Sequence, residues 1–200
     1  MLFELTELIG IISFSLSGFY IAVRNDLDIL GIFISAFLTA LGGGIIRDTI
    51  AGEKPASLIS ITPMSIVIVM VFILLLLEFH KKHSYERKPI FVFIDSIGLV
   101  SFSISGALVA IDHSFSLSGV IIFAFITAVG GGILRDMLIN VVPYVLKGGF
   151  YAIISIIIGA IVYLLSFFKL LGFFSLLILF FFGIILRWFA FIKNWKLSNF

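Results

Sequence analysis

Apolar residues run along this chain in long blocks, separated by short segments that hold most of the charge. A membrane-spanning helix needs about 20 apolar residues. Seven blocks meet or approach that length, at 5–23, 29–51, 57–77, 90–111, 115–140, 148–168 and 170–186. The blocks are too long for membrane strands and do not alternate with polar residues. The pattern therefore predicts an all-α integral membrane protein with seven transmembrane helices.

Composition supports a lipid environment. Of the 200 residues, 62% are hydrophobic and only 12% are charged, whereas soluble domains carry about 25% charged residues. The net charge of +2 gives no reason to expect a nucleic-acid partner. The chain has no cysteine, which excludes disulfides and thiolate chemistry. Glu4 and Glu7 near the N-terminus indicate a first span and not a cleaved signal peptide.

Basic residues predict the orientation, because they favour the cytoplasmic side of the membrane. With the N-terminus outside, nine basic residues fall on the cytoplasmic side and two on the other. The nine are Arg24, Lys81, Lys82, Arg87, Lys88, Lys147, Arg187, Lys193 and Lys196, and the two are Lys54 and Lys169. We therefore expect an external N-terminus and a cytoplasmic C-terminus.

An internal repeat organises the chain. The sequence GGGIIRD at 42–48 returns as GGGILRD at 130–136, and residues 10–55 align with 98–143 without a gap. Each copy holds three predicted spans, so the second copy must enter the membrane from the opposite face. We expect two inverted three-helix repeats, 5–80 and 90–168, followed by an extra helix at 170–190. Inverted repeats with glycine-interrupted helices recur in transport proteins.

The two triglycines lie near mid-membrane, in the second and fifth spans. Consecutive glycines weaken a helix, and irregular backbone at this depth is tolerated only inside protein or along a watery cavity. We expect kinked helices that cross at a pore constriction; close helix packing is the alternative. The candidate pore or hinge residues are Gly42, Gly43, Gly44, Gly130, Gly131 and Gly132, with Thr39 and Thr127 one turn before them.

Charged pairs follow each triglycine within the membrane: Arg47 with Asp48, and Arg135 with Asp136. Neighbouring residues on a helix point about 100° apart, so each arginine should find its partner on another helix. Glu7 and Asp95 begin the first and fourth spans at matching depths. We predict the interhelical pairs Glu7–Arg47 and Asp95–Arg135. Arginines that extend to lipid phosphates are the alternative.

Other polar positions are less informative. Ser13 and Ser17 form a one-face stripe with Gly18, and Ser101, Ser105 and Gly106 repeat it; helix packing is the expected role. His80 and His83 have metal-ligand spacing, but their basic loop predicts solvation and contact with anionic lipid. All three histidines lie in loops or at span ends, so we expect neither a resident metal nor an enzyme.

These features together resemble the prokaryotic relatives of the trimeric intracellular cation (TRIC) channels, a family also catalogued as bacterial glycine transporters. The resemblance covers nearly the whole chain and depends on the doubled GGGxxRD. It implies a homotrimer in the prokaryotic plasma (inner) membrane, with a pore in each subunit along spans 1, 2, 4 and 5. It implies passage of monovalent cations, chiefly potassium, without a cofactor. Animal members bind a phosphoinositide, but their span-2 motif is absent here.

Two other functions remain open from the residues alone. An amino-acid carrier, for glycine or a similar zwitterion, would need a carboxylate clamp and an ammonium clamp close together. A membrane scaffold would use the glycines for packing only. Cation passage requires Arg47 and Arg135 to be neutralised, because an unpaired arginine about 4 Å away would repel a cation by roughly 4 kcal/mol.

Overall fold

A computed structural model describes residues 2–79, 89–147 and 150–195, and these ranges form helices joined by short connections. The helices are α1 Leu2–Arg24, α2 Ile29–Ala51, α3 Ala56–Ile59, α4 Ile61–Leu76, α5 Pro89–Asp112, α6 Leu117–Leu138, α7 Tyr144–Lys147, α8 Tyr151–Phe167 and α9 Phe173–Ile192. Five of them, α1, α2, α5, α6 and α9, are long and apolar enough to cross a membrane, and α4 and α8 are shorter apolar helices. The basic loop with His80 and His83 lies outside the described residues.

The predicted spans match seven of these helices, with two differences. The last helix continues to Ile192, so Arg187 lies inside α9 and is only 3% exposed. Arg187 therefore lies in the buried interior of the bundle, and the side of the membrane to which we assigned it stays a prediction. In addition, each RD motif is followed by a short helix that was not predicted: α3 lies largely within the 57–77 block, and α7 lies between two blocks.

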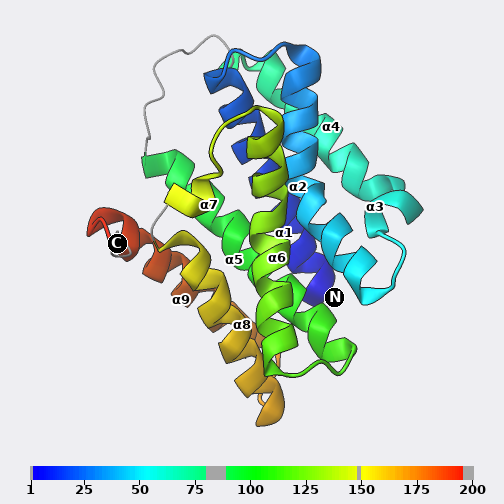
Figure 1. Cartoon of the computed structure of the whole chain (residues 1–200), viewed down its shortest axis with the longest axis vertical. Helices are drawn as coiled ribbons and strands as arrows, with labels where there is room; N and C mark the ends of the chain where they lie inside the picture. The colour runs from blue at the N-terminus through cyan, green and yellow to red at the C-terminus, as the bar shows by residue number, and fades with distance from the viewer. Residues whose placement is uncertain (1, 80–88, 148–149, 196–200) are drawn as a thin grey trace.

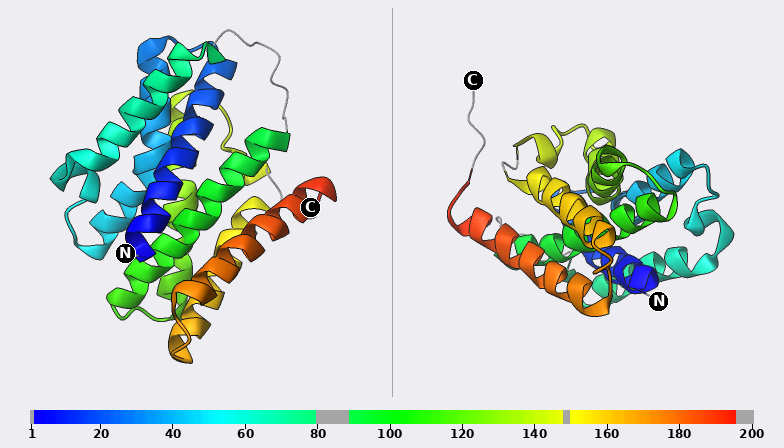
Figure 2. Two further views of the ribbon diagram at one scale, coloured as in Figure 1. Left: turned by 180° about the vertical axis from the view of Figure 1, so that it is seen from behind. Right: turned by 90° about the horizontal axis from the view of Figure 1, so that it is seen from below.

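Four helices form the centre of the bundle. α2 packs on α6, α1 packs on α5, and these pairs are joined by α1–α2 and α5–α6 contacts (Figure 1). α4 covers α1 and α2, while α8 covers α5 and α6. α9 packs on α5 and α8, and it lies on the opposite side of the bundle from α4 (Figure 2). The outer faces of α4 and α9 expose large apolar side chains such as Phe72 and Phe174, as a lipid-facing surface should.

The triglycines bring α2 and α6 together. A Cβ built on Gly43 would overlap the carbonyl oxygen of Thr127, and one on Gly131 would lie 2.5 Å from the carbonyl oxygen of Thr39. These matched contacts show that backbone meets backbone at the crossing. Both helices continue without interruption through their glycines. The role that these contacts show is close helix packing, the alternative given above to a kinked constriction. Glycine has no side chain to pack, so the neighbouring helix packs directly against its backbone.

A second matched contact joins α1 to α5. The Phe14 ring fills the space beside Gly98, and the Phe102 ring fills the space beside Gly10. The two ring centroids are 5.2 Å apart, and both side chains are buried. Aromatic rings from the two halves therefore meet in the middle of the bundle, between the charged clusters described next.

Candidate functional site

Arg47 is the centre of a buried ionic cluster that joins three helices. Its Nε donates to Asp48 Oδ1 at 2.7 Å, and its Nη1 donates to Glu7 Oε1 at 2.5 Å and to Ser105 Oγ at 2.7 Å. The Ser105 hydroxyl also donates to Glu7. The guanidinium lies over the Phe3 ring, 5.2 Å from its centroid. The predicted Glu7–Arg47 pair is therefore confirmed, and Arg47 is only 2% exposed, which excludes contact with lipid phosphate.

The RD neighbours do bind each other, contrary to expectation. Arg47 Nε reaches Asp48, and Arg135 Nε reaches Asp136 Oδ1 at 2.9 Å. The expectation considered only the directions of the Cβ atoms, whereas the long arginine side chain folds back to its neighbour. The second oxygen of each aspartate accepts from a backbone N–H eight residues later, in the following short helix. Each aspartate therefore ties its arginine to α3 or α7.

The matching cluster around Arg135 is arranged differently. Arg135 Nη2 lies 2.8 Å from Asp136 Oδ1, and its Nη1 donates to Thr39 Oγ1 at 3.3 Å. Asp95 instead accepts from Ser17 Oγ at 2.8 Å. Within the described ranges, no ion pair within 4.0 Å joins Asp95 to Arg135. The predicted Asp95–Arg135 pair was therefore wrong, because the shorter aspartate is bonded to α1 and the arginine has turned to α2.

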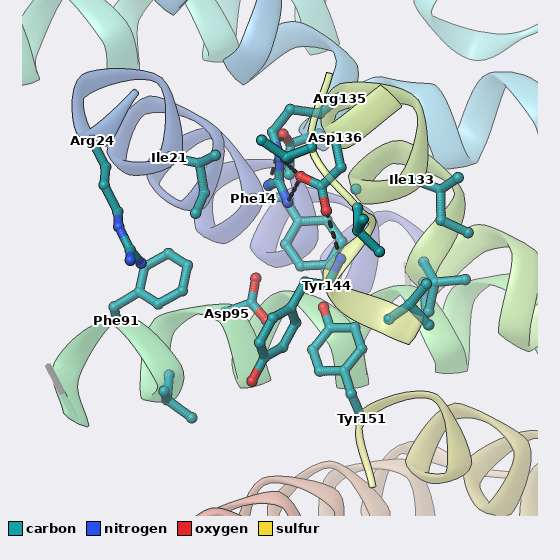
Figure 3. A pocket seen from close by; sticks show the side chains of 18 of the residues that line it. Phe14, Ile21, Arg24, Phe91, Asp95, Ile133, Arg135, Asp136, Tyr144 and Tyr151 are labelled. Atoms are coloured by element: carbon teal, nitrogen blue, oxygen red, sulfur yellow. Dashed lines mark hydrogen bonds and ion pairs between the residues drawn. The ribbon is translucent and has the colours of Figure 1, made fainter. Parts of the chain in front are cut away.

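A cavity of about 270 Å³ opens between these groups, and we call it the Asp95 cavity. Phe14, Thr39, Asp95, Arg135 and Tyr151 are among the residues that line it. Figure 3 shows the Asp95 carboxylate facing this space from α5, with the Arg135–Asp136 pair across from it.

The space beside the other cluster, which we call the Glu7 pocket, measures about 20 Å³. Glu7, Leu41, Arg47, Asp48 and Ser57 are among its lining residues. A cavity needs roughly 10–15 Å³ on this measure to hold one water. The protein interior is thus roomy beside Asp95 and nearly filled beside Glu7.

The remaining candidates have mixed outcomes. Thr39 lines the Asp95 cavity, while Thr39 and Thr127 both donate to the carbonyl four residues back in their own helices, at 2.6 and 2.7 Å. Gly18 and Gly106 serve close packing, as expected of the stripe: a Cβ on Gly18 would lie 2.6 Å from Ala36 Cα. The stripe's serines do more than pack, because Ser17 and Ser105 bind the two intramembrane acids.

Three residues near the cavity escaped prediction. Arg187 Nη2 donates to Tyr144 Oη at 3.2 Å, and its guanidinium lies over the Tyr151 ring, 5.2 Å from the centroid. Tyr151 in turn lies beside Asp95. The available signal was the apolar sequence on both sides of Arg187, which continues the last span past it. The tyrosines begin segments that the repeat does not match residue by residue, so they gave no signal.

The unequal arginine contacts predict unequal energetic coupling. In a double-mutant cycle on unfolding free energy, Glu7→Gln and Arg47→Gln should couple by about 1.5–3 kcal/mol, the value of a charge-assisted hydrogen bond. The matched cycle, Asp95→Asn with Arg135→Gln, should couple by less than about 0.5 kcal/mol because these residues do not contact each other. Equal coupling in both cycles would contradict the geometry.

Apolar helices that enclose buried ion pairs and a polar cavity define a polytopic membrane protein. Intramembrane charges of this kind mark solute pathways. The chain belongs to the family described as "Glycine transporter", whose model matches residues 4–81 and 92–166. This agrees with the family expected from the doubled motif.

Similar proteins agree with that assignment. The UPF0126 membrane protein YvgT of Bacillus subtilis is 39% identical, covering 100% of this chain and 96% of YvgT. The inner membrane protein YadS of Escherichia coli K12 is 30% identical, covering 82% of this chain and 78% of YadS. A structure solved to explain conductance through TRIC cation channels has a TM-score of 0.88 at 33% identity, covering 100% of this chain and 98% of that one. A prokaryotic TRIC channel crystallised in 0.5 M KCl has a TM-score of 0.86 at 30% identity, covering 98% of this chain and 99% of that one.

Proposed function

We propose that this protein is a monovalent cation channel, permeable to potassium, with one pathway inside each subunit. The observation that carries the proposal is that two buried clusters of charged and polar groups, around Arg47 and around the Asp95 cavity, are built by the same four central helices. The similarity to TRIC cation channels supports it. The pathway passes the α2–α6 crossing, where Gly42–Gly44 and Gly130–Gly132 leave backbone close to the interior.

The matched contacts support the inverted arrangement. Glu7, Arg47 and Asp48 have the counterparts Asp95, Arg135 and Asp136, each placed on the equivalent helix of the other half. We infer that 5–80 and 90–168 are inverted repeats and that 170–190 is an added helix. With the N-terminus outside, the Arg47 cluster lies toward the outer face of a prokaryotic plasma membrane, and the Asp95 cavity opens toward the cytoplasm.

The charges along this pathway suit a cation. The Arg47 cluster contains one guanidinium and two carboxylates, Glu7 and Asp48, and so does the set formed by Asp95, Arg135 and Asp136. Each of these two arginines is neutralised by its neighbouring aspartate, which leaves Glu7 at one end and Asp95 at the other. At the Asp95 end two further guanidiniums lie close by, Arg24 in the cavity lining and Arg187 over the Tyr151 ring. The repulsion expected from Arg47 and Arg135 is thereby removed, and Glu7 leaves a modest negative potential at its end for a potassium or sodium ion. Thr39 offers a hydroxyl oxygen between the two ends.

The conformation described is closed at the Arg47 cluster and open at Asp95. Opening requires Arg47 to release Glu7 or Ser105 and the Phe14–Phe102 contact to separate. We also propose a homotrimer, on the basis of the TRIC similarity, in which lipid covers the exposed faces of α4 and α9.

Cation selectivity tests the proposal. Proteoliposomes loaded with KCl and diluted into N-methyl-D-glucamine chloride should develop a negative interior potential, reported by a voltage-sensitive dye. The potential should disappear when the interior salt is also N-methyl-D-glucamine chloride, and empty liposomes should show neither response. KCl-loaded proteoliposomes that develop no more potential than empty liposomes would overturn the proposal.

A glycine carrier is the second candidate, and one observation favours it. The Asp95 cavity contains a carboxylate and a guanidinium that do not bind each other, which are the two groups a small zwitterion needs. The family's description is consistent with this reading. Saturable uptake of radiolabelled glycine, with counterflow from preloaded vesicles, would establish the carrier in place of the channel.

A further inference from the structure

The acids that begin α1 and α5 occupy matched positions but differ by one methylene. Glu7 and Asp95 lie 88 residues apart, the offset that also relates Arg47 to Arg135 and Ser17 to Ser105. Each acid accepts a hydrogen bond from the serine of the other half: Ser105 donates to Glu7, and Ser17 donates to Asp95. The acid–serine contact is therefore the same at both ends, so the two ends must differ in another contact of the acid.

That difference is the contact with arginine. Glu7 holds its serine and also reaches Arg47 Nη1 at 2.5 Å. Asp95 is shorter by one carbon–carbon bond, about 1.5 Å. It bonds to Ser17 and lies beside the Tyr151 hydroxyl, and among the described residues no ion pair within 4.0 Å joins it to Arg135. Arg135 Nη1 donates instead to Thr39 Oγ1 at 3.3 Å, a long bond between a charged donor and a neutral acceptor. A carboxylate within reach would form the stronger bond.

The end that lacks the acid–arginine contact also has the larger free volume. About 20 Å³ remains beside Glu7, where acid, serine and arginine are closed on one another. About 270 Å³ is open beside Asp95, where they are not. We propose that the length of the acidic side chain at positions 7 and 95 selects which end of the pathway is sealed: glutamate closes its end and aspartate leaves its end open. The inference rests on the pathway under Proposed function, but accessibility tests it without any need for conduction.

The absence of cysteine in the native sequence allows a clean test. Leu41 lines the Glu7 pocket and its matched residue Val129 lines the Asp95 cavity, so a single cysteine at either position reports on one end. The probe is a membrane-impermeant methanethiosulfonate applied to protein in liposomes. Both native side chains are buried, so the comparison depends on the space beside them: with the native acids, Val129→Cys should react faster than Leu41→Cys because the Asp95 cavity is the larger.

Lengthening the acid should close the open end. In the Val129→Cys protein, Asp95→Glu should slow modification by about tenfold or more, the change expected for one added charge-assisted hydrogen bond. Asp95→Asn is the matched control, since it removes the charge without adding length and should leave the reaction rate within about twofold. Unchanged reactivity in a folded Asp95→Glu protein would overturn the proposal, as would equal slowing in Asp95→Asn.

Shortening the other acid gives an independent arm, which decides the matter if Asp95→Glu does not fold. In the Leu41→Cys protein, Glu7→Asp should speed modification by about tenfold, because the shorter acid no longer reaches Arg47, which keeps Asp48 and Ser105. No acceleration would contradict the proposal. The predicted accessibility pattern in a protein that passes no cations would refute the proposed function and leave the length rule intact.

Discussion

Replacing Gly43 with alanine should destabilise the folded protein by about 1–3 kcal/mol, the usual cost of forcing an extra carbon into a packed interior. The new Cβ would overlap the Thr127 carbonyl oxygen, which belongs to the backbone of α6. Backbone has no alternative rotamer, so α2 and α6 must separate to make room. Separation there would also disturb Thr39 and Arg135, which bond across the same crossing. Unfolding in mixed micelles, followed by circular dichroism, measures the loss.

The control lies in the same triglycine. A Cβ on Gly44 would come no nearer than 3.8 Å to Arg47 Nη2, so the helix interface tolerates it. Gly44→Ala should be neutral or stabilising by up to about 1 kcal/mol, because alanine favours helix more than glycine does. Equal destabilisation by both substitutions would show that the glycines are needed for backbone freedom, and would contradict the close-packing interpretation.

Changing Arg47 to lysine should weaken the seal while keeping the positive charge. The guanidinium holds Glu7, Asp48 and Ser105 at once through its planar fork, whereas an ammonium is a compact donor on a flexible stem. Loss of even one charge-assisted bond changes an equilibrium by about ten- to a hundredfold. We therefore expect the ratio of closed to open time in Arg47→Lys to fall by that factor, measured in single-channel records.

Arg135→Lys is the matched control for that measurement. Arg135 binds its neighbour Asp136 and reaches Thr39 only at 3.3 Å, so it does not seal its end. Its replacement should change the closed-to-open ratio by less than about threefold, because no seal is lost. A larger effect for Arg135→Lys than for Arg47→Lys would place the closure at the Asp95 end of the pathway and contradict a seal at the Arg47 cluster.

The sequence predicted the helices because lipid enforces long apolar stretches, and the repeat predicted which charged residues correspond. It also predicted the Glu7–Arg47 pair, since matching depth and opposite charge were enough. The Asp95–Arg135 prediction was wrong because it considered only matching depth in the membrane, and the aspartate side chain is one methylene shorter than glutamate. The burial of Arg187 was not predicted, because a charge near the end of an apolar block is usually a boundary, whereas here the side chain lies inside the bundle on α9.

The triglycines show a different limit. Sequence reasoning left packing and backbone loosening open, because glycine permits both. Only the position of the other helix separates them: the Thr127 carbonyl lies where a Cβ on Gly43 would be, which makes close approach the observed role. The serines Ser17 and Ser105 were underestimated for the same reason, since their acceptors are on α5 and α1, far away in sequence.

Recording from the purified protein in a planar bilayer, with potassium on one side and sodium on the other, tests the central claim most directly. Discrete unitary currents that reverse near the potential set by the monovalent cations are the predicted result. A silent bilayer, from the same preparation that shows saturable glycine uptake with counterflow, would contradict a channel and establish a carrier.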